Sequence, residues 1–294
     1  MSFNIGTRML NRIIILVSVS GGKDSQATAN YILKKHKRIP VVLYFADTGW
    51  EAKETYKHLD YLEATWNKKI HRIKSKKYNG MEDLAKKRGF PNRLKRFCTE
   101  ELKIIPSNNF IKQYQEQGYT VINVVGVRND ESKSQKLKKP KIINGVNWLF
   151  TPKRDVENKW KFSFFYPCSK KIIKAKQGVL IYQPILNWTA KQVLEYNLKC
   201  GTRNNPLYSQ GRTRVGCEPC VECGVREISD LAIETVLRIT KLEQEVSELK
   251  GKKCVFYHKG GELQDFNKLY TKYKYKHNAL DLDFGCINQF GICE

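Results

Sequence analysis

The sequence predicts an α/β fold built on a doubly wound, mostly parallel sheet, and three observations support this class. Short apolar runs alternate with amphipathic segments of helical length, which favours parallel strand pairing. The first of these runs leads through a glycine pair into a helix-forming segment, an arrangement typical of strand-to-helix turns that bind anions. With 294 residues, the chain can bury one such core and still form a smaller appendage.

The predicted elements follow in a regular order. Residues 13–19 and 41–46 are short apolar runs and are predicted to be strands, and residues 121–127 form a third clear strand. The intervening segments 25–37 and 53–66 have the composition of amphipathic helices. Because ligands of such sheets bind at the carboxyl ends of the strands, we look for the site in the loops that follow them.

The C-terminal part of the chain has a different character. Residues 190–197 are predicted to form a helix capped by the hydroxyl of Thr189, and residues 231–249 repeat apolar side chains at helical spacing. We expect residues 1–200 to form the α/β domain and residues 201–294 a cysteine-rich, helical region.

Between these parts lies a segment, about residues 133–180, in which aromatic side chains are interleaved with lysines. The alternation of apolar residues is less regular here, so we expect an insertion over the active-site edge of the sheet. A packed hairpin and a base-stacking surface are the two interpretations of its aromatic residues.

The segment Ser18–Ser25, with the sequence Ser-Val-Ser-Gly-Gly-Lys-Asp-Ser, is predicted to form an anion cradle. The start of a helix exposes unpaired backbone N–H groups, and the glycines let a phosphate approach them. The hydroxyls of Ser20 and Ser25 are possible donors, and Lys23 adds a positive charge. The spacing differs from the Walker-type loop, which places four residues between its first glycine and the Gly-Lys pair. A motor or switch NTPase is therefore not expected.

Nine cysteines point to metal or thiol chemistry. No apolar stretch reaches transmembrane length and residues 1–12 lack the apolar core of a signal peptide, so we expect a soluble, cytoplasmic protein without a membrane partner. In that compartment cysteines serve as metal ligands or redox thiols more often than as disulfides. Cys217, Cys220 and Cys223 form two overlapping Cys-x-x-Cys steps on one loop, and their thiolates can face a single metal centre. Spacing alone leaves iron–sulfur and zinc open.

The formal charge is +24, from 53 Lys and Arg against 29 Asp and Glu. Such an excess attracts polyanions, so tRNA or DNA is a plausible partner, although a general bias toward lysine would produce the same total.

The motif Ser-Gly-Gly-Lys-Asp-Ser resembles the PP-loop of the ATP pyrophosphatase, or adenine nucleotide alpha hydrolase, superfamily. Further segments resemble the phosphoadenosine phosphosulfate (PAPS) reductase-like branch in the same order: Asp47-Thr48-Gly49-Trp50, Arg96-Phe97-Cys98-Thr99, Gly126–Ser132 (Gly-x-Arg-x-x-Glu-Ser), Asn205-Pro206-Leu207-Tyr208 and Gly216–Cys220 (Gly-Cys-x-x-Cys). The resemblance covers roughly residues 13–223 and implies a Rossmann-like sheet of the HUP type.

The resemblance also implies roles for particular residues. The nucleotide, ATP or PAPS with Mg²⁺, would be bound by Ser18, Ser20, Gly21, Gly22, Lys23, Asp24, Ser25, Phe45, Thr48, Arg128 and Glu131. Catalysis would involve Lys23, Asp24, Asp47, Arg128 and Cys223. A [4Fe–4S] cluster, or zinc as the alternative, would be held by Cys98, Cys217, Cys220 and Cys223. The tail cysteines Cys286 and Cys293 are alternative ligands or a redox pair.

Three functions are compatible with these features. The first is cleavage of ATP to AMP and pyrophosphate, which adenylates an acceptor for sulfur transfer, with tRNA or DNA as acceptor and a cysteine desulfurase or thioredoxin-like protein as donor. The second is reduction of PAPS or adenylyl sulfate to sulfite by a cysteine thiol. The third is a non-catalytic nucleotide-binding subunit. In each case we expect a homo-oligomer.

Overall fold

The structure is a computed structural model, and it describes residues 13–92, 95–128, 141–143, 146–148, 152–154, 160–164, 173–174, 179–257 and 265–280. Contacts divide the chain into two compact units. The first unit comprises Met1–Ala46, Tyr56–Ile73 and Ile104–Asn205, and the second Asp47–Thr55, Lys74–Lys103 and Pro206–Glu294. The second unit therefore contains segments from the N-terminal half of the chain, whereas the expected domains were continuous, with a boundary between residues 200 and 201.

The first unit is built on a seven-stranded sheet in the order β3-β2-β1-β4-β10-β6-β5. Five neighbouring strands pair in parallel: β3 (Ile70–Ile73), β2 (Val41–Ala46), β1 (Ile13–Ser18), β4 (Thr120–Val124) and β10 (Leu180–Tyr182). Beyond β10, β6 (Val146–Trp148) and the edge strand β5 (Lys141–Ile143) pair in antiparallel fashion. The predicted mostly parallel α/β sheet is thus confirmed.

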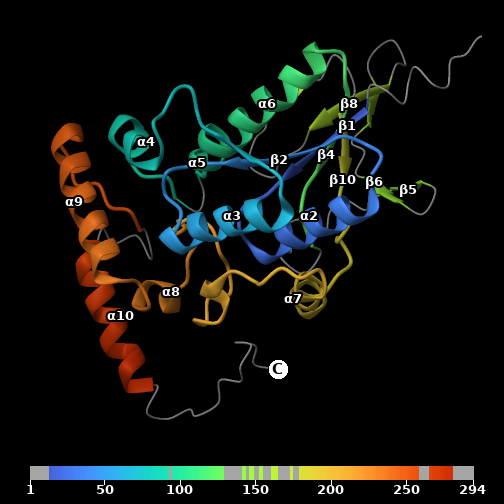
Figure 1. Cartoon of the computed structure of the whole chain (residues 1–294). Helices are drawn as coiled ribbons and strands as arrows, with labels where there is room; N and C mark the ends of the chain where they lie inside the picture. Colours follow the sequence, from blue (N-terminus) through green and yellow to red (C-terminus); the bar gives the residue numbers. More distant parts are fainter. Residues whose placement is uncertain are drawn as a thin grey trace, which may run out of the picture. The chain divides into compact units, whose positions relative to one another are not determined.

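Helices cover both faces of this sheet, as Figure 1 shows for α6 (Ile105–Glu116) on one side and α2 (Lys23–Lys35) and α3 (Lys53–Trp66) on the other. The sequence of β1 explains this, because successive side chains of a strand point to opposite faces. Ile15 and Val17 belong to the apolar cluster that includes residues of α2 and α3. Ile14 and Leu16 belong to a second cluster, which includes residues of α6. Both faces of the strand are therefore buried, as a doubly wound sheet requires.

Two predicted elements differ in length from the structure. The strand predicted at 121–127 ends at Val124 in the structure. Arg128 therefore lies in the loop, four residues after the end of the strand. The predicted helix 25–37 begins at Lys23, directly after Gly22. The predicted cap of α7 (Ala190–Lys199) is confirmed: Thr189 accepts a hydrogen bond from the backbone N–H of Gln192 in a capping box.

Part of the predicted insertion is described. Antiparallel strands β7 (Pro152–Arg154), β8 (Trp160–Phe164) and β9 (Ile173–Lys174) form a separate small sheet. Together with the β5–β6 pair, they give the insertion the antiparallel pairing expected of hairpins. Its remaining residues lie outside the described part of the chain.

The second unit is mainly helical, with α4 (Met81–Arg88), α5 (Phe97–Thr99), α8 (Val225–Ser229), α9 (Ile233–Lys250) and α10 (Phe266–Leu280). Its core gathers Trp50, Phe256 and Phe266 with the apolar face of α9. That face uses Val236, Ile239, Leu242 and Val246, so the apolar spacing predicted for residues 231–249 packs into a core. In the described residues no helix is both long and apolar enough to cross a membrane.

Candidate functional site

The loop between β1 and α2 has the local geometry of the predicted cradle. Gly21 has a φ of +76°, a left-handed conformation that favours glycine. Gly22 is the N-cap of α2, and its carbonyl oxygen accepts the first helical hydrogen bond from Gln26 N at 3.1 Å. The helix therefore starts at the glycine pair, and its first N–H groups point out of the helix end toward any bound anion.

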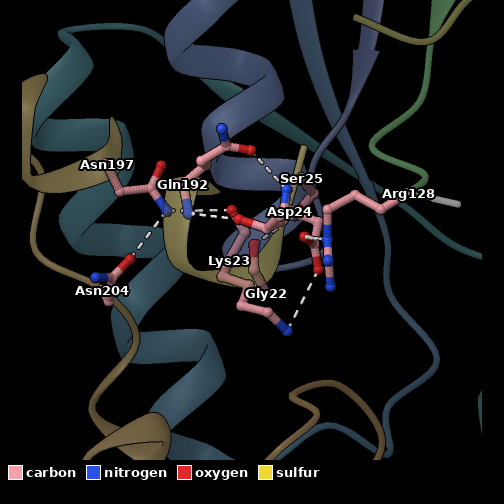
Figure 2. A network of polar contacts seen from close by, with 9 residues as sticks. Gly22, Lys23, Asp24, Ser25, Arg128, Gln192, Asn197 and Asn204 are labelled. Carbon is pink, nitrogen blue, oxygen red and sulfur yellow. Dashed lines mark hydrogen bonds and ion pairs between the residues drawn. The ribbon is translucent and has the colours of Figure 1, made fainter. Parts of the chain in front are cut away.

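A buried charge cluster lies at the start of α2 (Figure 2). The Asp24 carboxylate forms an ion pair with Arg128 Nε, and its second oxygen lies 3.5 Å from Lys23 Nζ. The Arg128 residue is 4% exposed, so this pair lies in a low-dielectric environment. The cluster places two cationic side chains beside the loop, and such groups suit a phosphate ligand. The structure thus brings together three predicted site residues, while Glu131 lies outside the described residues.

The loop serines take different roles. Ser25 Oγ donates to the carbonyl oxygen of Gly22 at 3.0 Å and accepts from Ser20 N at 3.0 Å. The proton of Ser25 is therefore used within the loop, where it holds the backbone in shape. Ser20 Oγ lies 3.1 Å from Ser25 Oγ, and Ser20 is exposed, so its hydroxyl is the better placed of the two for a ligand. Ser18 is the last residue of β1.

Two buried asparagines that were not among the predicted site residues complete the loop. Asn205 Nδ2 donates to the carbonyl oxygen of Gly21 at 3.1 Å, and Asn197 Nδ2 donates to that of Lys23 at 3.1 Å. Both side chains are buried, and Figure 2 shows Asn197 between the loop and Asn204. For Asn205 the sequence signal was its place in the Asn-Pro-Leu-Tyr motif, and no local pattern marked Asn197.

Behind α2, the buried His58 continues this polar network. Its Nε2 lies 2.9 Å from Gln26 Oε1, and Gln26 Nε2 donates to the carbonyl oxygen of Arg203. Because the Gln26 amide oxygen can only accept, His58 carries its proton on Nε2. Burial, together with the positive charge of Arg203, lowers the pKa of His58 to about 4. The imidazole is therefore neutral at physiological pH.

The predicted site residues at the end of strand β2 and in the turn after it have different surroundings. Phe45 is buried in the apolar core of the first unit, so only its backbone is available to a nucleotide. In the second unit, Asp47 accepts a hydrogen bond from Gly49 N at 2.9 Å and forms an ion pair with the exposed Lys74 at 3.3 Å. Thr48 Oγ1 donates to Glu51 Oε1 at 2.7 Å. These contacts shape the turn after the strand.

The second unit contains a cavity of about 50 Å³ that three of the four predicted metal ligands line: Cys98, Cys217 and Cys220. The cysteine loop pairs with residues 50–52, through Glu218 N to Trp50 O at 2.8 Å and an isolated bridge between Glu51 and Cys217. This pairing places the first cysteine of the loop at the cavity wall.

Lys103 also lines the cavity, and its Nζ lies 3.5 Å from Cys217 Sγ. Burial raises the pKa of Cys217 to about 11 against the opposing effect of the Lys103 charge, and burial raises the pKa of Cys98 as well. Without a metal both side chains are therefore neutral thiols at physiological pH, and loading with a metal would release protons.

Cys223, the fourth predicted ligand, does not line this cavity. It is 3% exposed and lies within the apolar core of the second unit. Among the described residues, no three His, Cys, Asp or Glu side chains are gathered closely enough to hold a metal ion as they stand. The thiols of Cys98, Cys217 and Cys220 are suitable ligands for a thiophilic metal or cluster. Their side chains would have to move closer together to bind it. Cys286 and Cys293 lie outside the described residues.

A second concave surface, of about 380 Å³, lies at the turn between α2 and β2. We call it the basic hollow; it is lined by Leu33, His36, Lys37, Arg38, Ile39, Pro40, Val41 and Lys68. Its charged lining residues are all cationic. Because β1 and β2 run in parallel, this turn lies at the opposite end of the strands from the loop at Ser20–Ser25.

Comparison with known proteins identifies a family and several similar chains. The family model described as "Phosphoadenosine phosphosulfate reductase domain" matches residues 14–223. An uncharacterized 37.8 kDa protein of Escherichia phage 186 is 29% identical over 289 residues, covering 80% of this chain and 75% of that protein. An uncharacterized protein of Methanocaldococcus jannaschii is 31% identical over 221 residues, covering 75% of this chain but only 38% of that protein. Among solved structures, a PAPS reductase from Candida auris in complex with phosphate has 20% identity and a TM-score of 0.45, with coverage of 70% of this chain and 82% of that one.

Proposed function

Because the chain belongs to the phosphoadenosine phosphosulfate reductase domain family, we propose that it is a PP-loop enzyme that cleaves ATP to AMP and pyrophosphate and adenylates an acceptor for sulfur transfer. The observation that carries this proposal is the loop at Gly21–Ser25. It combines outward-pointing N–H groups at a helix start with the cations of Lys23 and Arg128, which are bridged by Asp24. This is the arrangement that stabilises charge on a leaving pyrophosphate.

The proposed reaction has two steps, adenylation of the acceptor and transfer of sulfur to it. In the first, an acceptor oxygen forms a bond to the α phosphorus of ATP, and the bond from that phosphorus to the bridging oxygen breaks, so its electron pair leaves with pyrophosphate. The loop N–H groups and Lys23 stabilise that charge, with Mg²⁺ supplied by the nucleotide complex. In the second step, a hydrosulfide from a donor protein attacks the activated centre, and AMP leaves with the acceptor oxygen.

A polynucleotide is the acceptor class that the charges favour. The chain carries a net charge of +24, and the basic hollow gathers Lys37, Arg38 and Lys68. A six-residue strand such as β2 is about 20 Å long at roughly 3.3 Å per residue, so one ligand that reaches both the hollow and the loop must be long. The phosphates of tRNA or DNA satisfy this requirement, and a free nucleotide does not.

The cysteine cavity would serve the sulfur chemistry. Cys98, Cys217 and Cys220 would hold a [4Fe–4S] cluster or zinc, with the Lys103 ammonium as a neighbouring positive charge. Such a group, when bound, would supply a site for sulfur or a structural clamp. The residues themselves position three thiols around one small, partly enclosed space.

Reduction of PAPS to sulfite is the second candidate, and the family description supports it. That reaction needs an accessible thiolate. Cys223, the predicted catalytic thiol, is 3% exposed and lies in the apolar core of the second unit, so a substrate has no direct access to it. The described cysteines therefore support adenylation more than reduction.

The proposal is tested by ATP turnover with Mg²⁺ after anaerobic purification, with tRNA and DNA offered as acceptors. We expect AMP and pyrophosphate from the wild type and their loss in Lys23→Ala. Formation of ADP and phosphate, or of no nucleotide product, would overturn it. Sulfite release from PAPS would establish the second candidate instead, and nucleotide binding without any product would indicate a non-catalytic subunit.

A further inference from the structure

We propose that Asn197 and Asn205 are positioning residues of the phosphate-binding loop: by holding two loop carbonyls, they turn the following N–H groups toward the pyrophosphate. This inference rests on the proposed function, because it assigns the anion that those N–H groups receive. Neither asparagine belongs to the glycine-lysine motif itself. They lie 174 and 184 residues beyond their partners Lys23 and Gly21.

The argument begins with peptide geometry. In a trans peptide, the carbonyl of one residue and the N–H of the next point in opposite directions. Asn205 holds the Gly21 carbonyl, so the N–H of Gly22 points away from Asn205. Asn197 adds a side-chain donor to the Lys23 carbonyl in the first turn of α2, and the N–H of Asp24 points in the opposite direction. Ser25 holds the intervening Gly22 carbonyl, so three successive carbonyls each have a side-chain donor.

The orientation of the Asn197 amide is determined by its neighbours. The indole of Trp66 can only donate, and it lies 2.8 Å from Asn30 Oδ1, which identifies the oxygen of that amide. Asn30 Nδ2 therefore faces Asn197 Oδ1 at 3.0 Å. Asn197 Nδ2 in turn faces two acceptors, Lys23 O and Asn204 Oδ1 at 2.9 Å. Rotation of the Asn197 amide by half a turn would place like groups against each other at all three contacts.

Burial makes these contacts rigid. Asn197 is 0% exposed and Asn205 is 1% exposed, so no bulk water replaces a missing donor at the loop carbonyls. A buried carbonyl without its donor turns toward another partner, and its peptide plane turns with it. We therefore expect removal of either amide to misdirect a loop N–H group while the charges of Lys23 and Arg128 remain in place.

The test uses Asn205→Ala and Asn197→Ala with Val193→Ala as a matched control. Val193 is fully buried on α7, the helix that carries Asn197, and packs near Ala27 of α2. Its truncation destabilises the same interface but removes no donor to the loop. For each full-length protein, calorimetry measures the affinity for pyrophosphate with Mg²⁺, and thermal denaturation measures stability.

We expect the dissociation constant for pyrophosphate to rise about tenfold in both asparagine variants, because a misdirected N–H group no longer donates a charge-assisted hydrogen bond to the anion. In Val193→Ala it should stay within about threefold at a comparable decrease of thermal stability. In ¹⁵N-glycine-labelled protein, the Gly22 amide signal should move on pyrophosphate addition in the wild type and in the control, and move less in Asn205→Ala. Should an alanine variant not fold, Asn205→Ser, which retains a shorter donor, takes its place and should bind pyrophosphate with intermediate affinity.

The outcomes separate this inference from the proposed function. Equal pyrophosphate affinity in the asparagine and valine variants would overturn the positioning role. If the wild type binds pyrophosphate but forms no AMP, the proposed function fails and the positioning role is still decided by the variants. If the wild type binds no pyrophosphate, both are overturned.

Discussion

A methyl group placed on Gly126 would lie 2.8 Å from both the carbonyl carbon and the carbonyl oxygen of Asp24. Real Cβ atoms do not approach backbone atoms this closely, so the chain leaving β4 passes against the first turn of α2 only because this residue has no side chain. The same close approach lets Arg128, two residues later, reach the Asp24 carboxylate. Gly126 and Arg128 of the Gly-x-Arg motif thus both bring the chain after β4 against Asp24 at the start of α2.

Gly126→Ala should therefore push the first turn of α2 away from the β4 exit. We expect the free energy of unfolding to fall by about 1–3 kcal/mol, as for other overpacked sites, and AMP formation to fall with it. Urea denaturation and the nucleotide assay measure the two effects. Gly224→Ala is the control, because a methyl group there meets no atom within 4 Å. Equal behaviour of the two variants would contradict the close approach.

Arg128→Ala should cost far more stability than removal of an exposed cation. It leaves Asp24 with one cation in a buried site, and breaking a buried pair typically costs about 3–5 kcal/mol. Lys112→Ala removes an exposed pair with Glu116, which is worth about 0–1 kcal/mol. Urea denaturation of both variants tests the difference. A decrease of less than about 1 kcal/mol in Arg128→Ala would mean that the pair is solvated.

His58 should make stability depend on pH in the acidic range. Its pKa is lowered to about 4 in the fold against 6.5 for the free side chain, so the unfolded chain binds the proton more readily. The free energy of unfolding that depends on neutral His58 is fully present above about pH 6.5. It falls by at most about 3 kcal/mol as the pH decreases toward 4. His58→Gln retains a donor for Gln26 and should flatten the slope of unfolding free energy between these pH values. An unchanged slope in urea titrations would show that His58 titrates normally.

The cysteines should separate into two groups by metal content. Cys98→Ser, Cys217→Ser and Cys220→Ser each remove a thiol from the cavity and should reduce bound iron or zinc after anaerobic purification. Cys223→Ser, which alters a core residue outside the cavity, should retain most of the metal. Elemental analysis and the visible absorption spectrum provide the readout. Complete absence of metal in Cys223→Ser would instead support a site with all four cysteines as ligands.

The basic hollow should contribute to polynucleotide affinity and its salt dependence. Lys37→Glu combined with Arg38→Glu should weaken binding of labelled tRNA and duplex DNA. The slope of log affinity against log salt should become shallower by roughly 0.7–0.9 for each phosphate that the variant no longer neutralises. Lys112→Glu combined with Lys241→Glu changes the net charge equally at exposed sites elsewhere. Equal effects of the two double variants would attribute binding to net charge alone.

Local sequence was sufficient to predict much of the fold. Short apolar runs predicted β1 and β2, amphipathic composition predicted α3, and apolar residues at helical spacing predicted α9, because burial acts on each segment according to its own local pattern. The need for glycine at position 21 is also local, because Gly21 adopts a left-handed conformation within the Gly-Gly motif of the loop. Boundaries were less certain, and β4 ends three residues earlier than its apolar pattern suggested.

The glycine-containing turn at Ser20–Ser25, the parallel sheet and the grouping of cysteines on one loop were all predictable from segments close together in the chain. Only the tertiary structure decided which distant side chains complete them. Asn197 and Asn205 hold the loop from more than 170 residues away, and Cys98 reaches the cavity while Cys223 turns into the core. Propensity and periodicity act between near neighbours in the chain, whereas a hydrogen-bond partner or a cavity wall is selected by the packing of whole elements, which no local pattern encodes.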